Sequence, residues 1–155
     1  MLKTSLASLT DRTPRYTVKE LAEKMGLSPY AVRYYDNAGL IPEVRRSPGN
    51  IRLFSDYNLG WLKLVHCLRA TGLPVSEVRR YIRMCQEGDV TIPQRAALIV
   101  EQGRKLKAQL AVLRQQMEIL EYKRKYYEDL MAHRREDRCN PATISQEPGI
   151  LPPEK

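Results

Sequence analysis

The sequence predicts a mainly α-helical protein, in which a compact N-terminal module with one small hairpin is followed by a long helix. Three observations support this prediction. Apolar residues recur at helical spacing in four stretches within residues 17–86. A strong turn signal, Ser47-Pro48-Gly49-Asn50, separates two short extended segments. From about Thr91 onward, a heptad pattern continues for about five repeats.

Length and charge limit the classes of function. A chain of 155 residues can bury one modest core. The net charge of +8 favours a polyanionic partner, either nucleic acid or an anionic membrane surface. No apolar run approaches the roughly 20 residues that a membrane-spanning helix needs, so nucleic acid is the better choice. Three widely spaced cysteines do not form a disulfide framework, which predicts a reducing cytoplasm: Cys67, Cys85 and Cys139.

The first two helices are expected to form a helix-turn-helix. Residues 1–15 show no period and are expected to be a disordered arm. Thr17 begins the first helix with Glu20 three positions later, which is a capping box, and Gly26 ends the helix. Ser28 is the N-cap of the second helix, and Gly39 ends it.

The second helix has one apolar face and one polar face. Ala31, Val32 and Tyr35 recur at helical spacing and are expected to face the core. The other face carries hydrogen-bonding groups and a cation: Tyr30, Arg33, Tyr34 and Asn37. Such a face fits the DNA major groove, where an arginine fork reads guanine. A solvated amphipathic helix explains the same residues, and they do not decide between the two.

The segment after the second helix predicts a cationic β-hairpin with arms at residues 43–47 and 50–55. The arms hold Arg45, Arg46 and Arg52, and no acidic residue lies within residues 44–54, so nothing within the hairpin neutralises them. A basic hairpin behind a recognition helix is the arrangement of a winged helix-turn-helix, which holds phosphates beside the groove. Residues 16–88 are therefore predicted to be a DNA-binding domain of this kind.

Two further helices complete the predicted module. Ser55-Asp56 begins the third helix, and Thr71-Gly72 interrupts it. The fourth helix spans residues 74–87 and keeps Arg79, Arg80 and Arg83 outside. These arginines are either solvated or close to backbone phosphates.

Residues 89–135 are predicted to be a dimerisation helix. About 40 helical residues span about 60 Å, so one chain leaves most of the apolar seam uncovered. The simplest solution is a twofold homodimer, in which an antiparallel coiled coil places one DNA-binding module at each end. The seam contains Leu106, Leu110, Leu113, Met117 and Leu120. Residues 136–155 are rich in proline and are expected to be a disordered tail.

In the order of its parts and in its motifs, the chain resembles the MerR family of bacterial transcription regulators. The matching motifs fall within residues 16–131 and are YTVKELA, VRYYD, GLIP, GNIRLF and LRATGL. The resemblance implies a homodimer that binds a palindromic operator and distorts promoter DNA so that RNA polymerase can use it. It also implies DNA-binding roles for Thr17, Ser28, Tyr30, Arg33, Tyr34, Tyr35, Arg45, Arg46, Asn50 and Arg52. Leu53-Phe54 departs from the Tyr-Tyr that family members often carry.

The residues around Cys67 are similar to the aldehyde-responsive branch of that family. This similarity covers residues 60–69 and 87–89, and it implies that Cys67 on the third helix is the effector-sensing thiol. Nearby cations, Lys63 and His66 among them, favour the reactive thiolate. Alternatively, Cys67 is a small buried residue that only packs.

Other functions remain open at this stage. A metal- or redox-responsive regulator of the same fold would need soft ligands, such as Cys85 of one subunit with Cys139 of the other. A coiled-coil adaptor that binds RNA or an acidic protein is the alternative from a different class. An enzyme is not expected, since the chain has two histidines, no phosphate loop and no paired carboxylates near a nucleophile. No cofactor and no resident metal site are expected either.

Overall fold

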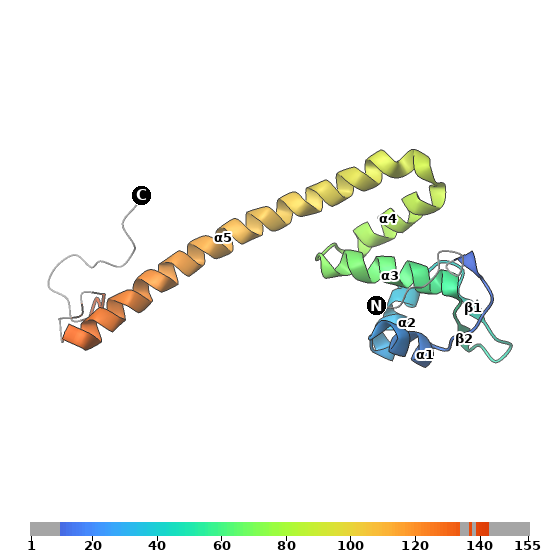
Figure 1. Ribbon diagram of the computed structural model, residues 1–155, viewed down its shortest axis with the longest axis horizontal. Coiled ribbons are helices and arrows are strands. Elements are labelled where there is room, and N and C mark those ends of the chain that lie inside the picture. Colours follow the sequence, from blue (N-terminus) through green and yellow to red (C-terminus); the bar gives the residue numbers. More distant parts are fainter. Residues whose placement is uncertain (1–9, 134–136, 138, 143–155) are drawn as a thin grey trace. The chain divides into compact units, whose positions relative to one another are not determined.

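The computed structural model describes residues 10–133, 137 and 139–142 (Figure 1). Most of the expected N-terminal arm and most of the expected C-terminal tail therefore lie outside the described residues. The described part is mainly helical, and the predicted fold class is confirmed: a helix-turn-helix with a hairpin precedes one long helix. The chain divides into two compact units, Met1–Gln102 and Gly103–Lys155.

The helix-turn-helix consists of α1 (Val18–Met25) and α2 (Pro29–Asn37). The predicted capping box is present, because Glu20 N donates to Thr17 Oγ1 at 3.3 Å and Thr17 N donates to Glu20 Oε2 at 2.8 Å. Gly26 then ends α1 in the left-handed conformation, at φ 64°. The two helices pack through buried side chains that include Leu21 and Val32.

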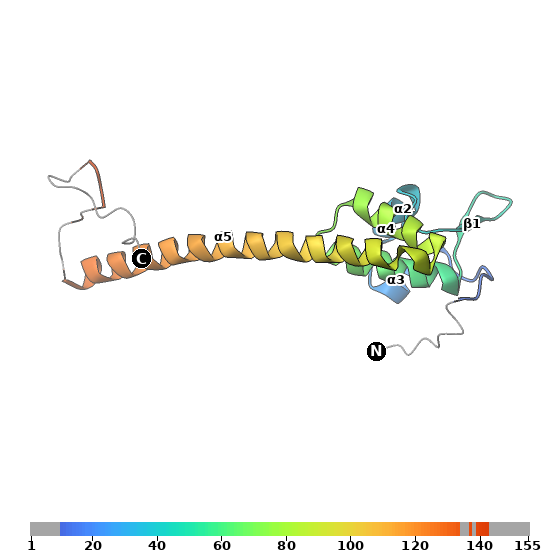
Figure 2. The ribbon, with the colours of Figure 1, turned by 90° about the horizontal axis from the view of Figure 1, so that it is seen from above.

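The hairpin pairs β1 (Arg45–Arg46) with antiparallel β2 (Arg52–Leu53), so the predicted hairpin is confirmed with shorter strands. Arg45 lies opposite Leu53, and Arg46 lies opposite Arg52. Asn50 occupies the turn at φ 61°, a conformation that asparagine tolerates better than most residues. Figures 1 and 2 show the hairpin projecting beyond the helices of the first unit.

Residues 11–15 do not form part of a disordered arm, and the sequence expectation is wrong for them. Arg15 N donates to Phe54 O at 2.8 Å, and Tyr57 N donates to Asp11 O at 3.0 Å. The Arg12 guanidinium also lies 4.2 Å from the centre of the Tyr57 ring. Backbone pairing and an aromatic contact hold this segment, and neither leaves a periodic signal in the sequence.

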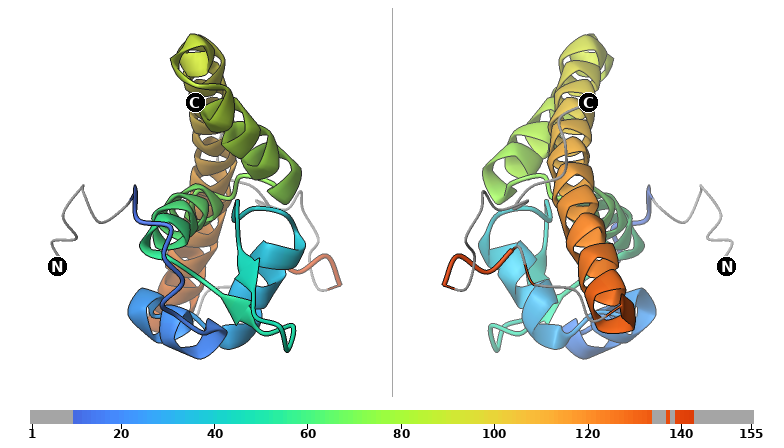
Figure 3. Two further views of the ribbon diagram at one scale, coloured as in Figure 1. Left: turned by 90° about the vertical axis from the view of Figure 1, so that its right-hand side faces the viewer. Right: turned by 90° about the vertical axis from the view of Figure 1, so that its left-hand side faces the viewer.

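Helices α3 (Asp56–Ala70) and α4 (Val75–Glu87) complete the core of the first unit. Ser55 caps α3 as predicted, in a capping box with Asn58. One apolar cluster joins α1, α2 and the start of α3, and a second joins α3 to α4. Trp61 packs against both clusters and connects them. In Figure 3 the two helices of the helix-turn-helix lie beside the hairpin below α3.

The long helix α5 (Ile92–His133) follows the short 3₁₀ turn η2 (Asp89–Thr91). The sequence predicts a long helix of about 40 residues here, and α5, with 42 residues, confirms it. The first unit extends to Gln102, past the boundary at residue 88 that the sequence suggests. The reason is that Leu98 packs on the second cluster and Gln102 Nε2 donates to Thr71 O at 2.8 Å. None of the described helices is both long enough and apolar enough to cross a membrane.

Residues 103–133 of α5 expose the apolar seam in the single chain. Every residue of the predicted seam core is exposed, Leu113 at 56% and Met117 at 63%. The helix as a whole contains no buried residue. An apolar row of this length in water is unfavourable, because each exposed leucine forgoes the free energy that burial supplies.

Candidate nucleic-acid interface

Helix α2 separates its residues as the sequence predicts. Val32 is fully buried, and Ala31 and Tyr35 are half-buried. The opposite face is exposed, with Tyr30 at 77% and Tyr34 at 44%, and it also carries Arg33 and Asn37. Two phenols, a guanidinium and an amide thus stand on one exposed surface, where they can donate hydrogen bonds to base edges.

The starts of α1 and α2 are both capped by a hydroxyl. Ala31 N donates to Ser28 Oγ at 3.1 Å, and Thr17 caps α1 in the same way. Capping satisfies only part of the backbone N–H groups in a first turn, and the helix dipole adds partial positive charge there. Both helix starts therefore offer N–H donors to an anion, and the start of α2, which has no acidic residue in its first turn, is the better suited to a phosphate. The exposed carboxylate of Glu20 is held at the first of them, and its pKa is lowered because it accepts hydrogen bonds from the backbone and hydroxyl of Thr17.

The hairpin presents two exposed arginines, Arg45 and Arg46. Arg46 Nη1 donates to Asn50 Oδ1 at 3.1 Å, so Asn50 holds this guanidinium over the turn. A guanidinium has five N–H donors, and this contact uses one nitrogen. Arg46 therefore keeps donors for a phosphate, whereas the amide oxygen of Asn50 is already occupied.

Arg52 differs from the other hairpin arginines, because it has an acidic partner outside the hairpin. Arg52 Nε lies 2.6 Å from Asp36 Oδ2, and Arg52 Nη2 donates to Asn37 Oδ1 at 2.6 Å. The acidic partner belongs to α2 and not to the hairpin, which is why inspection of residues 44–54 missed it. Since the two side chains are only 20% and 14% exposed, the pair connects the hairpin to α2 in a partly desolvated setting.

Arg79 is a second contact to α2 that the sequence did not indicate. Its side chain is exposed, as predicted, but Arg79 Nε donates to Ala38 O at 2.9 Å. Ala38 is the C-cap of α2, where carbonyl groups lack partners within the helix. Helix α4 thus supports the end of α2. The sequence shows that an arginine lies on the exposed side of α4. It does not show that this arginine donates to a carbonyl group 41 residues away.

The segment before α1 is anchored by a buried carboxylate. Tyr16 OH donates to Asp56 Oδ1 at 2.8 Å, and Arg15 Nη1 lies 3.6 Å from Asp56 Oδ2. Asp56 is 6% exposed. The pKa of Tyr16 is raised, chiefly because its hydroxyl donates to this carboxylate and the neutral phenol is favoured.

Cys67 is exposed on α3, so the alternative in which it packs as a buried residue is wrong. The buried face of α3 includes Leu62, Val65 and Leu68. Cys67 lies outside it and shares its exposed side with His66 and Lys63. The helix rotates position 67 away from the core even though leucines lie at positions 64 and 68.

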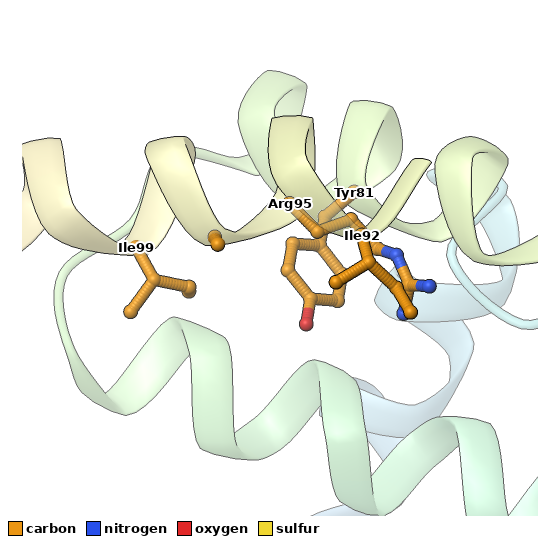
Figure 4. Close-up of a pocket in the computed structure, with 5 residues that line it drawn as sticks. Tyr81, Ile92, Arg95 and Ile99 are labelled. Atoms are coloured by element: carbon orange, nitrogen blue, oxygen red, sulfur yellow. The ribbon is translucent and has the colours of Figure 1, made fainter. Parts of the chain in front are cut away.

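Cys85 on α4 lies beside a shallow hollow between α4 and α5. Arg95 Nη1 lies 3.6 Å from Cys85 Sγ, and Arg95 Nε donates to Thr91 Oγ1 at 3.1 Å. The hollow is lined by Tyr81, Ile92, Arg95, Ala96 and Ile99. Figure 4 shows Tyr81 of α4 beneath α5, together with Ile92, Arg95 and Ile99 of α5. Within the described residues, no three His, Cys, Asp or Glu side chains gather as metal ligands would.

Known proteins resemble this chain over most of its length. Residues 16–85 match the family model described as MerR HTH family regulatory protein. An HTH-type transcriptional regulator of Haemophilus influenzae is 38% identical over 117 residues, which are 76% of this chain and 87% of that protein. The crystal structure of HiNmlR, a MerR family regulator lacking the sensor domain, bound to promoter DNA, shares 38% identity and a TM-score of 0.59. It covers 76% of this chain and 94% of that one. PbrR691 from Ralstonia metallidurans CH34, in complex with lead(II), shares 28% identity and a TM-score of 0.53, over 88% of this chain and 97% of that one.

Proposed function

Because the chain belongs to the MerR HTH family of regulatory proteins, we propose that it is a homodimeric transcription activator that senses small electrophilic aldehydes through Cys67. Membership of the family makes it a DNA-binding transcription regulator and not an enzyme. The proposal adds the signal, the dimer and the mode of activation. The observation that carries it is the exposure of the Cys67 thiol on α3.

We assign the DNA contacts to α2, to the hairpin and to two helix starts. The exposed face of α2 enters the major groove, where Arg33 donates to a guanine. Arg45 and Arg46 bind phosphates beside that groove, and Thr17 and Ser28 place the first turns of α1 and α2 against the backbone. Arg52 acts as a positioning residue, because its guanidinium is bound by Asp36 and Asn37. The whole set that the resemblance implies is Thr17, Ser28, Tyr30, Arg33, Tyr34, Tyr35, Arg45, Arg46, Asn50 and Arg52. Within this set, Tyr35 packs against both apolar clusters, so it acts, like Arg52, by positioning and not by touching DNA.

The dimer is proposed from the exposed seam of α5. A second copy of the same helix is the simplest apolar partner for Leu106, Leu110, Leu113, Met117 and Leu120. Antiparallel pairing gives each operator half-site its own DNA-binding unit. The two units then hold the duplex at two points, and DNA deformation is offset by contacts that form only on distorted DNA. RNA polymerase recognises the promoter in that distorted form.

The sensing step is addition of a thiolate to a carbonyl. The Cys67 sulfur bonds to the aldehyde carbon, the carbonyl electron pair moves to oxygen, and this oxygen takes up a proton to give a hemithioacetal. Lys63 lies one helical turn before Cys67 on the same exposed side of α3 and places a cation on that side of the helix. No oxidant is needed, because the adduct forms without electron loss.

Transcription from a cognate promoter tests the proposal. We expect Cys67→Ser to bind promoter DNA as the unmodified protein does and to lose induction by formaldehyde. Cys85→Ser is the matched control, since it removes another thiol of the same unit and should leave induction unchanged. Induction that persists in Cys67→Ser would remove Cys67 from the mechanism.

A metal-responsive regulator is the second candidate, because PbrR691 has been solved in complex with lead(II). In this chain the ligands would be Cys85 of one subunit and Cys139 of the other. The same assay separates the candidates. Induction by lead salts that is lost in Cys85→Ser and kept in Cys67→Ser would favour the metal.

A further inference from the structure

A thiol and an amine lie in contact at the C-terminal end of α5. Lys123 Nζ is 3.1 Å from Cys139 Sγ, although the residues are 16 positions apart. Both residues are half-buried, and both belong to the unit Gly103–Lys155, whereas Cys67 belongs to the other unit. The site therefore has two nucleophilic atoms in contact, independent of the proposed sensing thiol.

Neighbouring hydrogen bonds hold Cys139 beside Lys123. Cys139 N donates to Tyr126 OH at 3.1 Å and lies 2.8 Å from Asp137 Oδ1. Tyr126 OH donates to the same Asp137 oxygen at 3.0 Å, and Lys123 Nζ lies 5.9 Å from the centre of the Tyr126 ring. These contacts attach the backbone at Cys139 to α5, so the thiol stays close to the amine.

The surroundings of other thiols and amines differ from this pair. Cys85 lies beside Arg95, whose guanidinium is not a nucleophile under ordinary conditions. Lys125 Nζ lies 3.7 Å from Glu121 Oε1, so its amine faces a carboxylate. Lys123 and Cys139 instead place an amine nitrogen and a sulfur within reach of a single bridging atom.

We propose that Lys123 and Cys139 form a capture site for formaldehyde, which closes an N–CH₂–S bridge between them. The Cys139 thiolate adds to the carbonyl carbon, and the oxygen takes up a proton that the Lys123 ammonium gives up, which yields S–CH₂–OH and a neutral amine. The Lys123 amine then forms a bond to that carbon while the C–O bond breaks. The hydroxyl leaves as water with the proton that the nitrogen loses. One aldehyde, one thiol and one amine thus yield one bridge and one water, with no change in oxidation state.

Contact between the two nucleophiles makes the second step efficient. After the thiol has added, the amine attacks within the same molecule, so the second step loses no translational entropy. A one-carbon aldehyde suits the site because a single atom must join two atoms that are already 3.1 Å apart. The bridge converts a non-covalent contact into a closed covalent loop from position 123 to position 139.

Mass spectrometry of the full-length protein with Cys67→Ser tests this site without the proposed sensor. After treatment with formaldehyde alone, we expect each chain to gain the mass of one carbon, which is formaldehyde added and water lost. Peptide mapping should place this carbon between Lys123 and Cys139. Lys123→Arg and Cys139→Ser on the same background should each lose the bridge.

Lys125→Arg is the matched control and should keep the bridge, because Lys125 is a neighbouring lysine that faces Glu121. Two results would overturn the proposal. In the first, the added carbon maps to other residues. In the second, Cys139 gains the full mass of formaldehyde without loss of water, and it does so equally in Lys123→Arg. Because every protein in the test lacks the Cys67 thiol, neither result bears on the sensing role of Cys67.

Discussion

At the scale of single residues, the contact between Arg52 and Asp36 determines how the hairpin meets α2. Removing the charge of Asp36 would leave the partly buried guanidinium of Arg52 without its anion. An unpaired charge in such a setting destabilises the folded state. Asp36→Asn should therefore lower the free energy of unfolding by about 1–3 kcal/mol. Chemical denaturation measures this change.

The control for that substitution is Glu23→Gln. Glu23 pairs with Lys19 at 4.0 Å on the surface of α1, where both side chains are well exposed. Exposed pairs of this kind contribute little to stability, so Glu23→Gln should leave the denaturation midpoint nearly unchanged. Equal losses in the two variants would mean that the Arg52 pair has no special role.

Arg33 and Arg46 should differ in how they affect DNA binding. Arg33→Ala should reduce the preference for the operator over random duplex by about 1–3 kcal/mol, because base contacts carry the discrimination. Arg46→Ala should reduce the affinity for the operator and for random duplex by the same factor, because phosphate contacts do not depend on base sequence. Titrations of both duplexes at one fixed salt concentration distinguish them. A uniform loss from Arg33→Ala would exclude its role in base reading.

The outcome for single residues shows what sequence can and cannot reveal. The caps at Thr17, Ser28 and Ser55 were predictable, because a capping residue and its partner lie within three positions of each other. The partners of Arg52 and Arg79 were not, since they depend on how elements 15 to 41 residues apart are packed. Aperiodic contacts of this kind become visible only in three dimensions.

At the scale of elements, α5 carries a compact set of ion pairs near its end. Arg124 Nη2 lies 2.5 Å from Glu121 Oε1, and Arg124 also pairs with Glu128. The guanidinium, which donates hydrogen bonds to the carboxylate, lowers the pKa of Glu121 to about 2 from 4.5. Such i,i+3 and i,i+4 pairs favour the helical backbone.

The pKa of Glu121 predicts a dependence on pH. Its pKa is lower in the folded chain than in the unfolded one, so its contribution is full above pH 4.5 and is lost as the pH falls toward about 2. Glu121→Gln should therefore reduce the loss of helix signal between these two pH values, as followed by circular dichroism. An identical acid transition in the two proteins would contradict the pairing in solution.

The long helix was the element most accessible to prediction, because a heptad pattern extends over many residues and needs no knowledge of packing. Its start was harder to assign. Residues 92–102 carry the same periodic signal as the rest of the helix, yet they belong to the first unit, where Leu98 contacts the α3–α4 cluster. Periodicity shows that a face is apolar and does not show which surface covers it.

At the scale of the whole molecule, the exposed seam predicts the oligomeric state. Leu113→Glu should give a folded single subunit in sedimentation, where the unmodified chain gives a dimer, because a buried carboxylate in the seam is unfavourable. Gln115→Glu, two positions further along the helix and off the seam, should remain dimeric. A single-subunit mass for the unmodified protein at micromolar concentration would contradict the proposed dimer.

The tip of the hairpin also offers a place for a spectroscopic reporter. A Cβ added at Gly49 would meet Ser47 Oγ at 3.8 Å, which is an ordinary contact, so a new side chain fits without rearrangement. A fluorophore attached through Gly49→Cys, in a chain whose native thiols have been replaced, would be quenched or shielded as the tip approaches a duplex. Stopped-flow records of that signal would resolve whether the tip engages before or after the rest of the protein.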